Sequence, residues 1–146
     1  MKISTKIEYG IVALIDISIN MRENEVVTVS SISERQGISK NYLEQVLTPL
    51  RQAGIIVGTK GAQGGYNLTS KPESLKLSTI LAALDSSLLT ISADSAGCDE
   101  NIKHAIDICL WSRMDSAVKA IAESVTLADL VEEYKKTNNT GVMFYI

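Results

Sequence analysis

The chain is poor in cysteine and has no long apolar run. Its 146 residues include two cysteines, Cys98 and Cys109, which are too few for the disulfide framework of a small secreted domain. No segment approaches the roughly 18 consecutive apolar residues that a membrane-spanning helix requires. Lys6, Glu8 and Asp16 interrupt the apolar residues near the N-terminus, unlike the layout of a signal peptide. We therefore expect a cytoplasmic protein with no membrane partner.

Residue patterns typical of enzymes are also scarce. Cys98 and the single histidine, His104, lie six residues apart, but no supporting Asn or Asp arrangement, oxyanion-type loop or cofactor motif accompanies them. A small thiol-dependent enzyme that uses Cys98 and His104 is therefore the weaker alternative. The chain also contains no internal repeat and no low-complexity tract.

Residues 30–54 predict two short helices joined by a tight turn. Ser31 and Glu34 have the spacing of a capping box, which predicts that the first helix begins at Ser31. Gly37 should end that helix, because glycine readily adopts the positive φ that a turn needs. Ser39 is the expected cap of the second helix, and Gly54 its expected end.

The second helix is amphipathic. Leu43, Val46, Leu47 and Leu50 form one apolar stripe, and Pro49 should kink the helix or tighten its last turn. The opposite face carries side chains that can bind phosphates or read base edges. These are Lys40, Asn41, Glu44, Gln45, Thr48, Arg51 and Gln52. The alternative is an ordinary helix whose polar face meets only solvent.

A glycine-rich hairpin follows directly. Residues 55–59 are strand-like, residues 60–65 form a turn with three glycines, and residues 66–68 return as a second strand. Glycines let the backbone approach another surface closely, and Lys60 is placed to approach a phosphate. A helix–turn–helix followed by such a wing is a DNA-docking arrangement, with one helix in the major groove. The two motifs together predict DNA binding.

Further helices are expected on both sides of this motif. They cover residues 3–20, 77–84, 99–125 and 126–134, with a loop over 85–97 and an apolar, strand-like tail over 142–146. The first should bury Ile11, Leu14, Ile15 and Ile19, and Thr126 should cap the last.

The helix predicted over residues 99–125 carries two apolar stripes. One consists of Ile106, Leu110, Met114, Ala117 and Ile121, and the other of Ile108, Trp111, Val118 and Val125. Two stripes indicate burial against the chain's own domain and against a second copy, as in a dimerisation helix. The alternative is the central helix of a monomeric bundle. Cys109 lies among these apolar residues and is expected to be a core thiol.

The N-terminal and C-terminal halves of the chain differ in charge. Residues 1–76 hold nine Lys and Arg against seven Asp and Glu, whereas residues 77–146 hold five against ten. Net charge is −3, so non-specific DNA binding should be weak, and affinity should depend on a specific site engaged by two copies.

The predicted fold is mostly α with a small β-wing. Residues 1–84 would form a winged helix–turn–helix DNA-binding domain, 85–98 a loop with a candidate sensor cysteine, and 99–146 a dimerisation helix with a C-terminal helix and tail.

Several segments resemble one known family over nearly the whole length. They are residues 2–6 with Tyr9, 32–39, 42–45, 50–54, 60–66 and 126–130. The resemblance is to the Rrf2 family, winged helix–turn–helix transcription regulators that include IscR, NsrR and CymR. Residues 143–146 are most similar to the CymR-like branch.

The resemblance implies a homodimeric, sequence-specific repressor of cysteine, sulfur or iron–sulfur metabolism genes, and not an enzyme. Its partners would be a double-stranded DNA operator and, in the CymR branch, a cysteine-synthesis enzyme. The expected DNA-binding residues, together with Arg51 from the polar face, are Ser39, Asn41, Tyr42, Glu44, Gln45, Lys60 and Gly61. Glu44 is suited to a cytosine amino group, whereas Lys60 and Gly61 would enter the minor groove. Lys60 replaces the arginine that is commoner in this family. The alternative is an interaction module that no longer binds DNA.

The resemblance also raises the question of a cofactor. Relatives with an iron–sulfur cluster have three cysteines in the region of residues 93–108, where this chain keeps only Cys98 as a counterpart. A cluster would require Cys98, His104 and Glu8 of the other subunit, although such clusters prefer thiolate ligands. We therefore expect no cofactor, and an iron–sulfur cluster is the alternative. A third option is a redox-sensing thiol at Cys98.

Overall fold

The computed structural model describes residues 2–23, 25–59 and 64–144. The α-helices in this part of the chain are α1 (Thr5–Asn20), α2 (Val29–Gln36), α3 (Lys40–Gln52), α4 (Leu77–Asp85), α5 (Glu100–Ile106), α6 (Ser112–Ser124) and α7 (Leu127–Phe144). The strands are β1 (Ile56–Thr59) and β2 (Gly65–Leu68), and the short helical turns are η1 (Pro72–Ser74), η2 (Ser86–Leu89) and the π-helical η3 (Asp107–Trp111). The predicted fold class, mostly α with a small β-wing, is confirmed.

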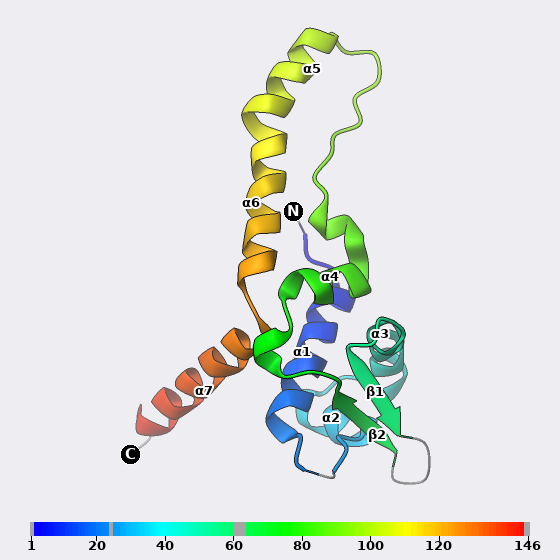
Figure 1. Cartoon of the computed structure of the whole chain (residues 1–146), viewed down its shortest axis with the longest axis vertical. Helices are drawn as coiled ribbons and strands as arrows, with labels where there is room; N and C mark the ends of the chain where they lie inside the picture. Colours follow the sequence, from blue (N-terminus) through cyan, green and yellow to red (C-terminus); the bar gives the residue numbers. More distant parts are fainter. Residues whose placement is uncertain (1, 24, 60–63, 145–146) are drawn as a thin grey trace.

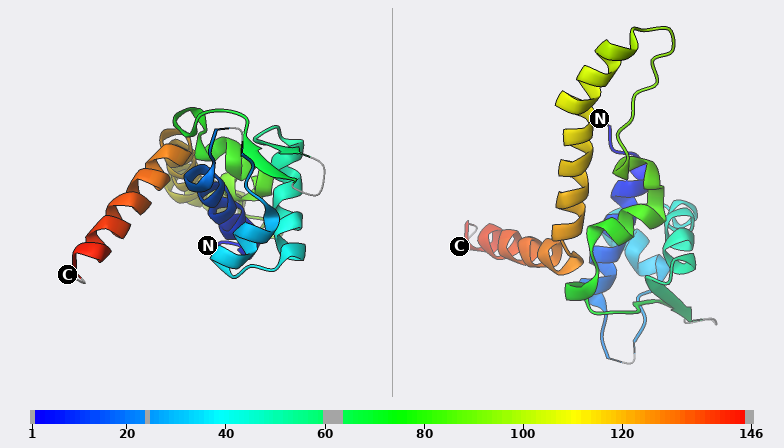
Figure 2. Two further views of the ribbon diagram at one scale, coloured as in Figure 1. Left: turned by 90° about the horizontal axis from the view of Figure 1, so that it is seen from below. Right: turned by 45° about the horizontal axis from the view of Figure 1, so that its top comes forward.

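Three parts can be followed in Figure 1. The head comprises residues 2–89 and holds α1 to α4 with the two strands. The arm is the continuous helix formed by α5, η3 and α6, and it rises away from the head. Helix α7 projects from the base of the arm, on the side of the head opposite the wing (Figure 2).

The core of the head contains the apolar stripes that the sequence predicts for α3 and α4. Leu43, Val46, Leu47 and Leu50 of α3 are all fully buried. Leu77, Ile80, Leu81 and Leu84 of α4 are buried as well. Burial of a leucine or isoleucine side chain stabilises a fold by about 1.5–3 kcal/mol, so these two stripes hold α3 firmly in place.

The buried face of α1 differs from the predicted one. Only Leu14 of the four expected residues is fully buried, whereas Ile11, Ile15 and Ile19 lie half-buried at the edge of the core. Gly10 explains why a different face of α1 is buried. A Cβ added at Gly10 would lie 2.5 Å from Cδ1 of Leu84 in α4. The glycine therefore lets α4 approach closely, and the close contact turns this side of α1 inward.

Helix α2 begins earlier than predicted. The side chain of Thr28, and not that of Ser31, caps it, since Thr28 Oγ1 accepts a hydrogen bond from the Ser31 amide at 3.1 Å. The predicted capping box of Ser31 and Glu34 is thus wrong, because Ser31 occupies the third helical position and donates its hydroxyl to the Thr28 carbonyl. Gly37 ends α2 with φ of 68°, as predicted.

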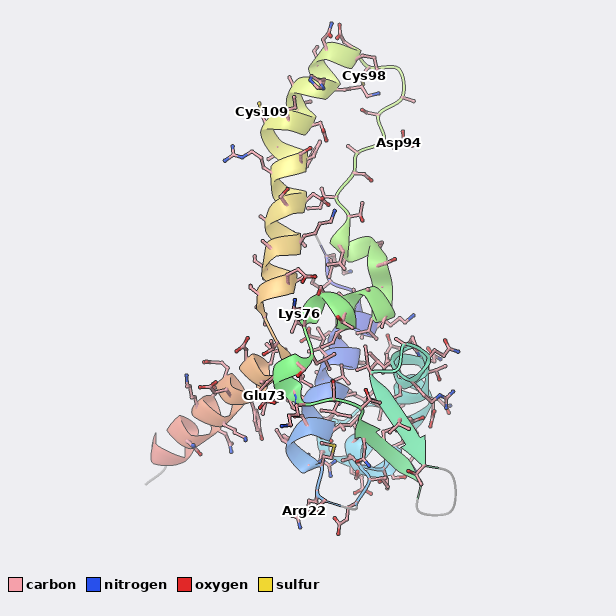
Figure 3. All side chains as sticks on the ribbon, viewed as in Figure 1. Arg22, Glu73, Lys76, Asp94, Cys98 and Cys109 are labelled. Carbon is pink, nitrogen blue, oxygen red and sulfur yellow. The ribbon has the colours of Figure 1, made fainter. Side chains whose placement is uncertain are left out.

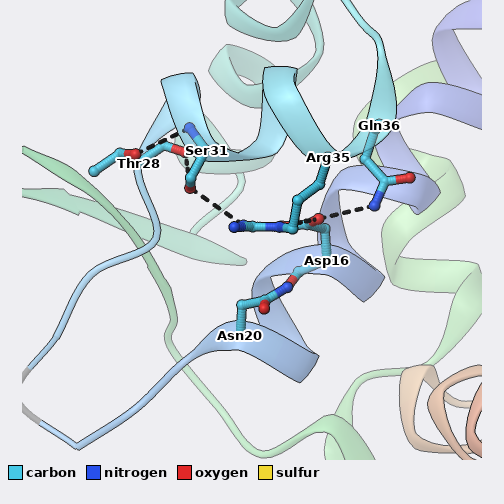
Figure 4. A network of polar contacts seen from close by, with 6 residues as sticks. All are labelled: Asp16, Asn20, Thr28, Ser31, Arg35 and Gln36. Carbon is cyan, nitrogen blue, oxygen red and sulfur yellow. Dashed lines mark hydrogen bonds and ion pairs between the residues drawn. The ribbon is translucent and has the colours of Figure 1, made fainter.

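A buried carboxylate connects α1 to α2 (Figure 4). Asp16 is 1% exposed, and it accepts hydrogen bonds from Arg35 Nε at 2.9 Å, Arg35 Nη2 at 2.7 Å and Gln36 Nε2 at 2.8 Å. Arg35 also donates to Ser31 Oγ. The hydrogen bond to Asp16 raises the pKa of Arg35. We call Asp16, Arg35 and Gln36 the α1–α2 clamp.

Backbone pairing fixes the base of the arm to the head. The Leu77 amide donates to the Val125 carbonyl at 2.9 Å, and the Leu127 amide donates to the Leu75 carbonyl at 2.8 Å. Lys76 and Thr126 form the isolated β-bridge between these bonds. The chain is therefore held at the point where α6 ends and α7 begins.

The predicted long helix over residues 99–125 is confirmed in existence and position. Asp99 caps it by accepting from the Asn101 amide at 2.8 Å. No local pattern in the sequence predicts η3, a π-helical turn that interrupts the α-helical spacing between α5 and α6.

Helix α7 is longer than predicted. Thr126 and Asp129 cap each other's amides, at 3.2 and 2.9 Å, and the helix continues to Phe144. The strand predicted over 142–146 is therefore wrong for residues 142–144, and residues 145–146 lie outside the described residues. No proline interrupts this segment, so the helix started by the reciprocal caps continues through it. Among the described helices, none combines the length and apolar content needed to cross a membrane.

The contribution of the α1–α2 clamp to stability can be tested by substitution. Replacing Arg35 by methionine keeps the apolar stem but removes the counter-charge of a buried carboxylate. Loss of one partner of a fully buried pair costs about 3–5 kcal/mol. The Arg35 side chain is 38% exposed, so we expect a smaller loss of unfolding free energy, about 2 kcal/mol.

Urea denaturation followed by circular dichroism measures this change. Lys103→Met, which breaks the ion pair of Lys103 with Glu100 near the tip of the arm, is the matched control and should shift the midpoint little. Equal effects of the two substitutions would show that the clamp contributes no special stability.

Candidate nucleic-acid interface

Helix α3 presents its polar face from a rigid position. Ser39 Oγ accepts from the Tyr42 amide at 3.2 Å, as predicted for the cap. At the other end Gly54, with φ of 77°, donates to the Arg51 carbonyl at 2.9 Å, and Ile55 donates to Leu50 at 3.0 Å. This pair of bonds is a Schellman motif, which ends the helix and leads the chain directly into β1.

The structure places most of the predicted DNA-binding residues on the exposed side of α3. Those that are exposed are Ser39, Asn41, Glu44, Gln45 and Arg51, whereas Tyr42 is half-buried. Thr48 is also half-buried and donates its hydroxyl to the Glu44 carbonyl at 2.7 Å, so it is already engaged within the helix. Lys60 and Gly61 lie outside the described residues.

A groove of about 530 Å³ separates α3 from the wing. Glu44 and Arg51 of α3 line one side, and the opposite side is formed largely by glycine backbone. The lining residues from the wing and the start of α2 are Val29, Gly58, Thr59, Gly64, Gly65 and Tyr66. One anionic and one cationic side chain thus face a surface with little side-chain bulk.

The wing is anchored to the segment before α2. Strands β1 and β2 are antiparallel, with Thr59 opposite Gly65, which confirms the predicted hairpin. Val27 extends the pairing, since its amide donates to the Tyr66 carbonyl at 3.0 Å and its carbonyl accepts from the Tyr66 amide at 2.8 Å. A Cβ on Gly65 would lie 2.5 Å from the Val27 carbonyl oxygen, so this close approach requires glycine.

The arm exposes a row of large apolar side chains, which we call the arm stripe. Ile121 is 63% exposed and Ile106 is 42% exposed. The stripe consists of Ile102, Ile106, Leu110, Met114 and Ile121, and it therefore contains most of the first predicted stripe. Trp111, Val118 and Val125 of the second stripe are half-buried, but Ile108 lies exposed within the π-helical turn.

The cysteines lie towards the tip of the arm (Figure 3). Both Cys98 and Cys109 are free and exposed, so the prediction of a core thiol at Cys109 is wrong. Cys109 belongs to the π-helical turn, where its neighbours Ile108 and Leu110 are also exposed. His104 is exposed as well.

The candidate metal ligands do not meet within one chain. Cys98 lies near the tip of the arm, whereas Glu8 belongs to α1 in the head. Among the described residues, no group of three or more His, Cys, Asp or Glu side chains could hold a metal ion. The described residues of one chain therefore do not bring together the ligands of an iron–sulfur cluster.

The sequence did not predict the role of Asp115, a carboxylate that binds the segment between η2 and α5 to the arm. Asp115 accepts from Lys119 Nζ at 2.7 Å and from the Ile91 amide at 2.9 Å. These two hydrogen bonds lower the pKa of Asp115. The spacing of Asp115 and Lys119 signals the first contact, but no local pattern signals the second.

Comparisons with known proteins agree with this geometry. The model of the Rrf2 family, described as an iron-dependent transcriptional regulator, matches residues 3–133. The chain is 32% identical to the transcriptional regulator IscR of Vibrio campbellii over 91% of its own length and 79% of the relative's. It is 34% identical to the transcriptional regulator CymR of Bacillus subtilis over the full length of both.

Solved structures give the same result. The structure of CymR, the global cysteine regulator of B. subtilis, has a TM-score of 0.75 and 32% identity, covering 91% of this chain and 98% of that one. T. potens IscR has a TM-score of 0.72 and 32% identity, covering 94% and 90%. Fold and relatives together define a winged helix–turn–helix transcription regulator and not an enzyme. The chain belongs to the Rrf2 family.

The anchoring of the wing makes the second prediction. Gly65→Ala should destabilise the wing by about 2 kcal/mol, because the new methyl group meets a backbone carbonyl that cannot move aside. Native-state hydrogen exchange of the Tyr66 amide should become faster by at least about tenfold. Val57→Ala, at an exposed position of β1, is the control and should leave that rate unchanged. Equal exchange rates in wild type and Gly65→Ala would contradict the close packing.

Proposed function

We propose that this chain is a dimeric, sequence-specific DNA-binding repressor of cysteine, sulfur or iron–sulfur metabolism genes. The observation that carries the proposal is the exposed polar face of α3, which lies across a groove from a glycine-rich wing. The metabolic assignment rests on the relatives, which are IscR proteins and the global cysteine regulator CymR. The division at residues 84 and 98 and the location in the cytoplasm belong to the same proposal.

Each residue of the interface has a role in this proposal. Ser39, Asn41 and Tyr42 lie at the N-terminal end of α3, where the helix dipole favours a phosphate. Glu44 and Gln45 are one turn further along and read base edges in the major groove. Arg51 lines the groove beside the wing and binds a backbone phosphate. Lys60 and Gly61 reach the minor groove.

Glu44 and Arg51 make contrasting predictions. Glu44→Ala should remove about 1–3 kcal/mol of discrimination at one base pair, because a carboxylate selects an amino donor. Arg51→Ala should weaken binding to all sequences alike and reduce the slope of log Kd against log salt by about one.

Competition binding tests both substitutions. The probe is DNA from upstream of the chain's own gene, and the competitors are its single-base variants. A uniform loss for Glu44→Ala would refute base reading by Glu44. A base-selective loss for Arg51→Ala would refute phosphate binding by Arg51.

The arm stripe supports dimerisation through the arm. Five large apolar side chains in a row are costly to expose to water, and a second copy of the same helix can cover them symmetrically. Two heads held together would match the two half-sites of an operator. The weak positive charge of the head fits such a requirement, since one head alone has little electrostatic affinity.

Ile121→Glu tests the dimer. A charge in the stripe should give a monomer by sedimentation, and loss of the second head should weaken operator binding by about 100-fold. Ser116→Glu, also exposed on α6 but outside the stripe, is the control and should remain dimeric. A monomeric wild type, or a dimeric Ile121→Glu with unchanged DNA affinity, would refute the arm as the interface.

The signal and further partners are part of the proposal too. Cys98 is exposed and open to oxidation as a sensing thiol. Since one chain does not assemble a ligand set, a cluster held by Cys98 and His104 would require Glu8 of a second chain. Visible absorption of protein purified without oxygen distinguishes these options, since only a cluster gives charge-transfer bands. A cysteine-synthesis enzyme, tested by pull-down, is the proposed protein partner.

A further inference from the structure

Two tyrosine rings meet where α1 passes the start of α3. The ring centroids of Tyr9 and Tyr42 lie 5.3 Å apart, and the ring planes are inclined at 82°. This is an edge-to-face contact, an arrangement that aromatic pairs favour by about 0.5–1.5 kcal/mol beyond their burial. Both rings are half-buried and pack against the edge of the core.

The two hydroxyl groups have no partner within the described part of the chain. None of the hydrogen bonds there involves the hydroxyl of Tyr9 or Tyr42. A buried side-chain oxygen without a partner is also absent from the described residues, so both hydroxyls reach solvent. Each tyrosine therefore holds its ring in the protein and leaves its polar end available.

Only Tyr42 lies on the element that reads DNA. It stands in the first turn of α3, and the cap bond from its amide to Ser39 fixes its backbone. That bond does not fix the side chain, whose two torsions remain to be set. The Tyr9 ring is the aromatic neighbour that packs against it, and α1 holds Tyr9 through its own contacts with α2, α3 and α4.

We propose that Tyr9 is a positioning residue for DNA binding. Its ring holds the Tyr42 ring in the orientation in which the Tyr42 hydroxyl donates to a backbone phosphate. The inference rests on the proposed function and extends the residues that serve the interface to α1. Fixing a side chain before binding raises affinity because less rotamer freedom is lost in the complex.

The substitutions separate the ring from the hydroxyl. Tyr9→Phe keeps the edge-to-face contact and should bind the operator fragment as wild type does. Tyr9→Leu and Tyr9→Met remove the ring and should weaken binding by about fivefold. Tyr42→Phe keeps the ring but loses the phosphate donor, and it should weaken binding by about tenfold.

A double-mutant cycle distinguishes positioning from general packing. When Tyr42 is already phenylalanine, Tyr9→Leu should change Kd by less than about twofold, because there is no hydroxyl left to orient. Fluorescence anisotropy with the labelled upstream fragment gives Kd, and thermal unfolding of each variant shows that it is folded. Tyr134→Leu, at an exposed tyrosine of α7, is the control and should bind as wild type does.

The outcomes are distinct. Equal losses for Tyr9→Leu in both backgrounds would overturn the positioning role, since they would indicate a packing defect that is independent of the hydroxyl. No loss for Tyr9→Leu or Tyr9→Met, or a loss for Tyr9→Phe as large as theirs, would overturn it as well. Failure of the wild-type chain to bind any fragment would instead overturn the proposed function, and this inference with it.

Discussion

The orientation of the helix–turn–helix depends on a carboxylate buried in α1. Burying the charged carboxylate of Asp16 without a counter-charge would destabilise the fold strongly. Among the described residues, the guanidinium of Arg35 and the side-chain amide of Gln36 donate the hydrogen bonds that this carboxylate accepts. Because Arg35 and Gln36 belong to the last turn of α2, the clamp holds the end of that helix against α1. Gly37 then turns the chain from α2 into α3. By holding the end of α2, Asp16 therefore also determines the direction in which the polar face of α3 points.

The same arrangement explains why α1 is the central element of the head. It contacts α2, α3, α4, α7 and β2. Gly10 admits α4, Asp16 binds α2, and Tyr9 meets α3. The buried stripe of α1 consists of Ile7, Gly10, Ala13, Leu14 and Ile17, and Asp16 and Tyr9 lie at further points of contact beside it.

Features that depend on local sequence patterns could be predicted, whereas those that depend on distant residues could not. The stripe of α3, its Ser39 cap, the Gly37 turn and the hairpin follow from local patterns, and the candidate interface was predictable because its residues lie on those elements. The buried face of α1 and the role of Asp16 depend on residues that are distant in the chain. Cys109 lies exposed in the π-helical turn, for which the sequence carries no local signal.

A short backbone bridge joins the base of the arm to the head, and α6 also contacts α4 and η2. Leu75 and Leu77 pair with residues 125–127, so the end of α6 and the start of α7 are fixed to the segment that leads into α4. Helix α4 packs on α1 at Gly10 and contacts α3. The bridge and the contacts of α4 thus connect the arm to α3 within each copy. A second copy that covers the arm stripe would therefore fix the angle between the two α3 helices. In the proposed dimer, half-site spacing is then set by the bridge at Lys76 and Thr126 as much as by the arm stripe itself.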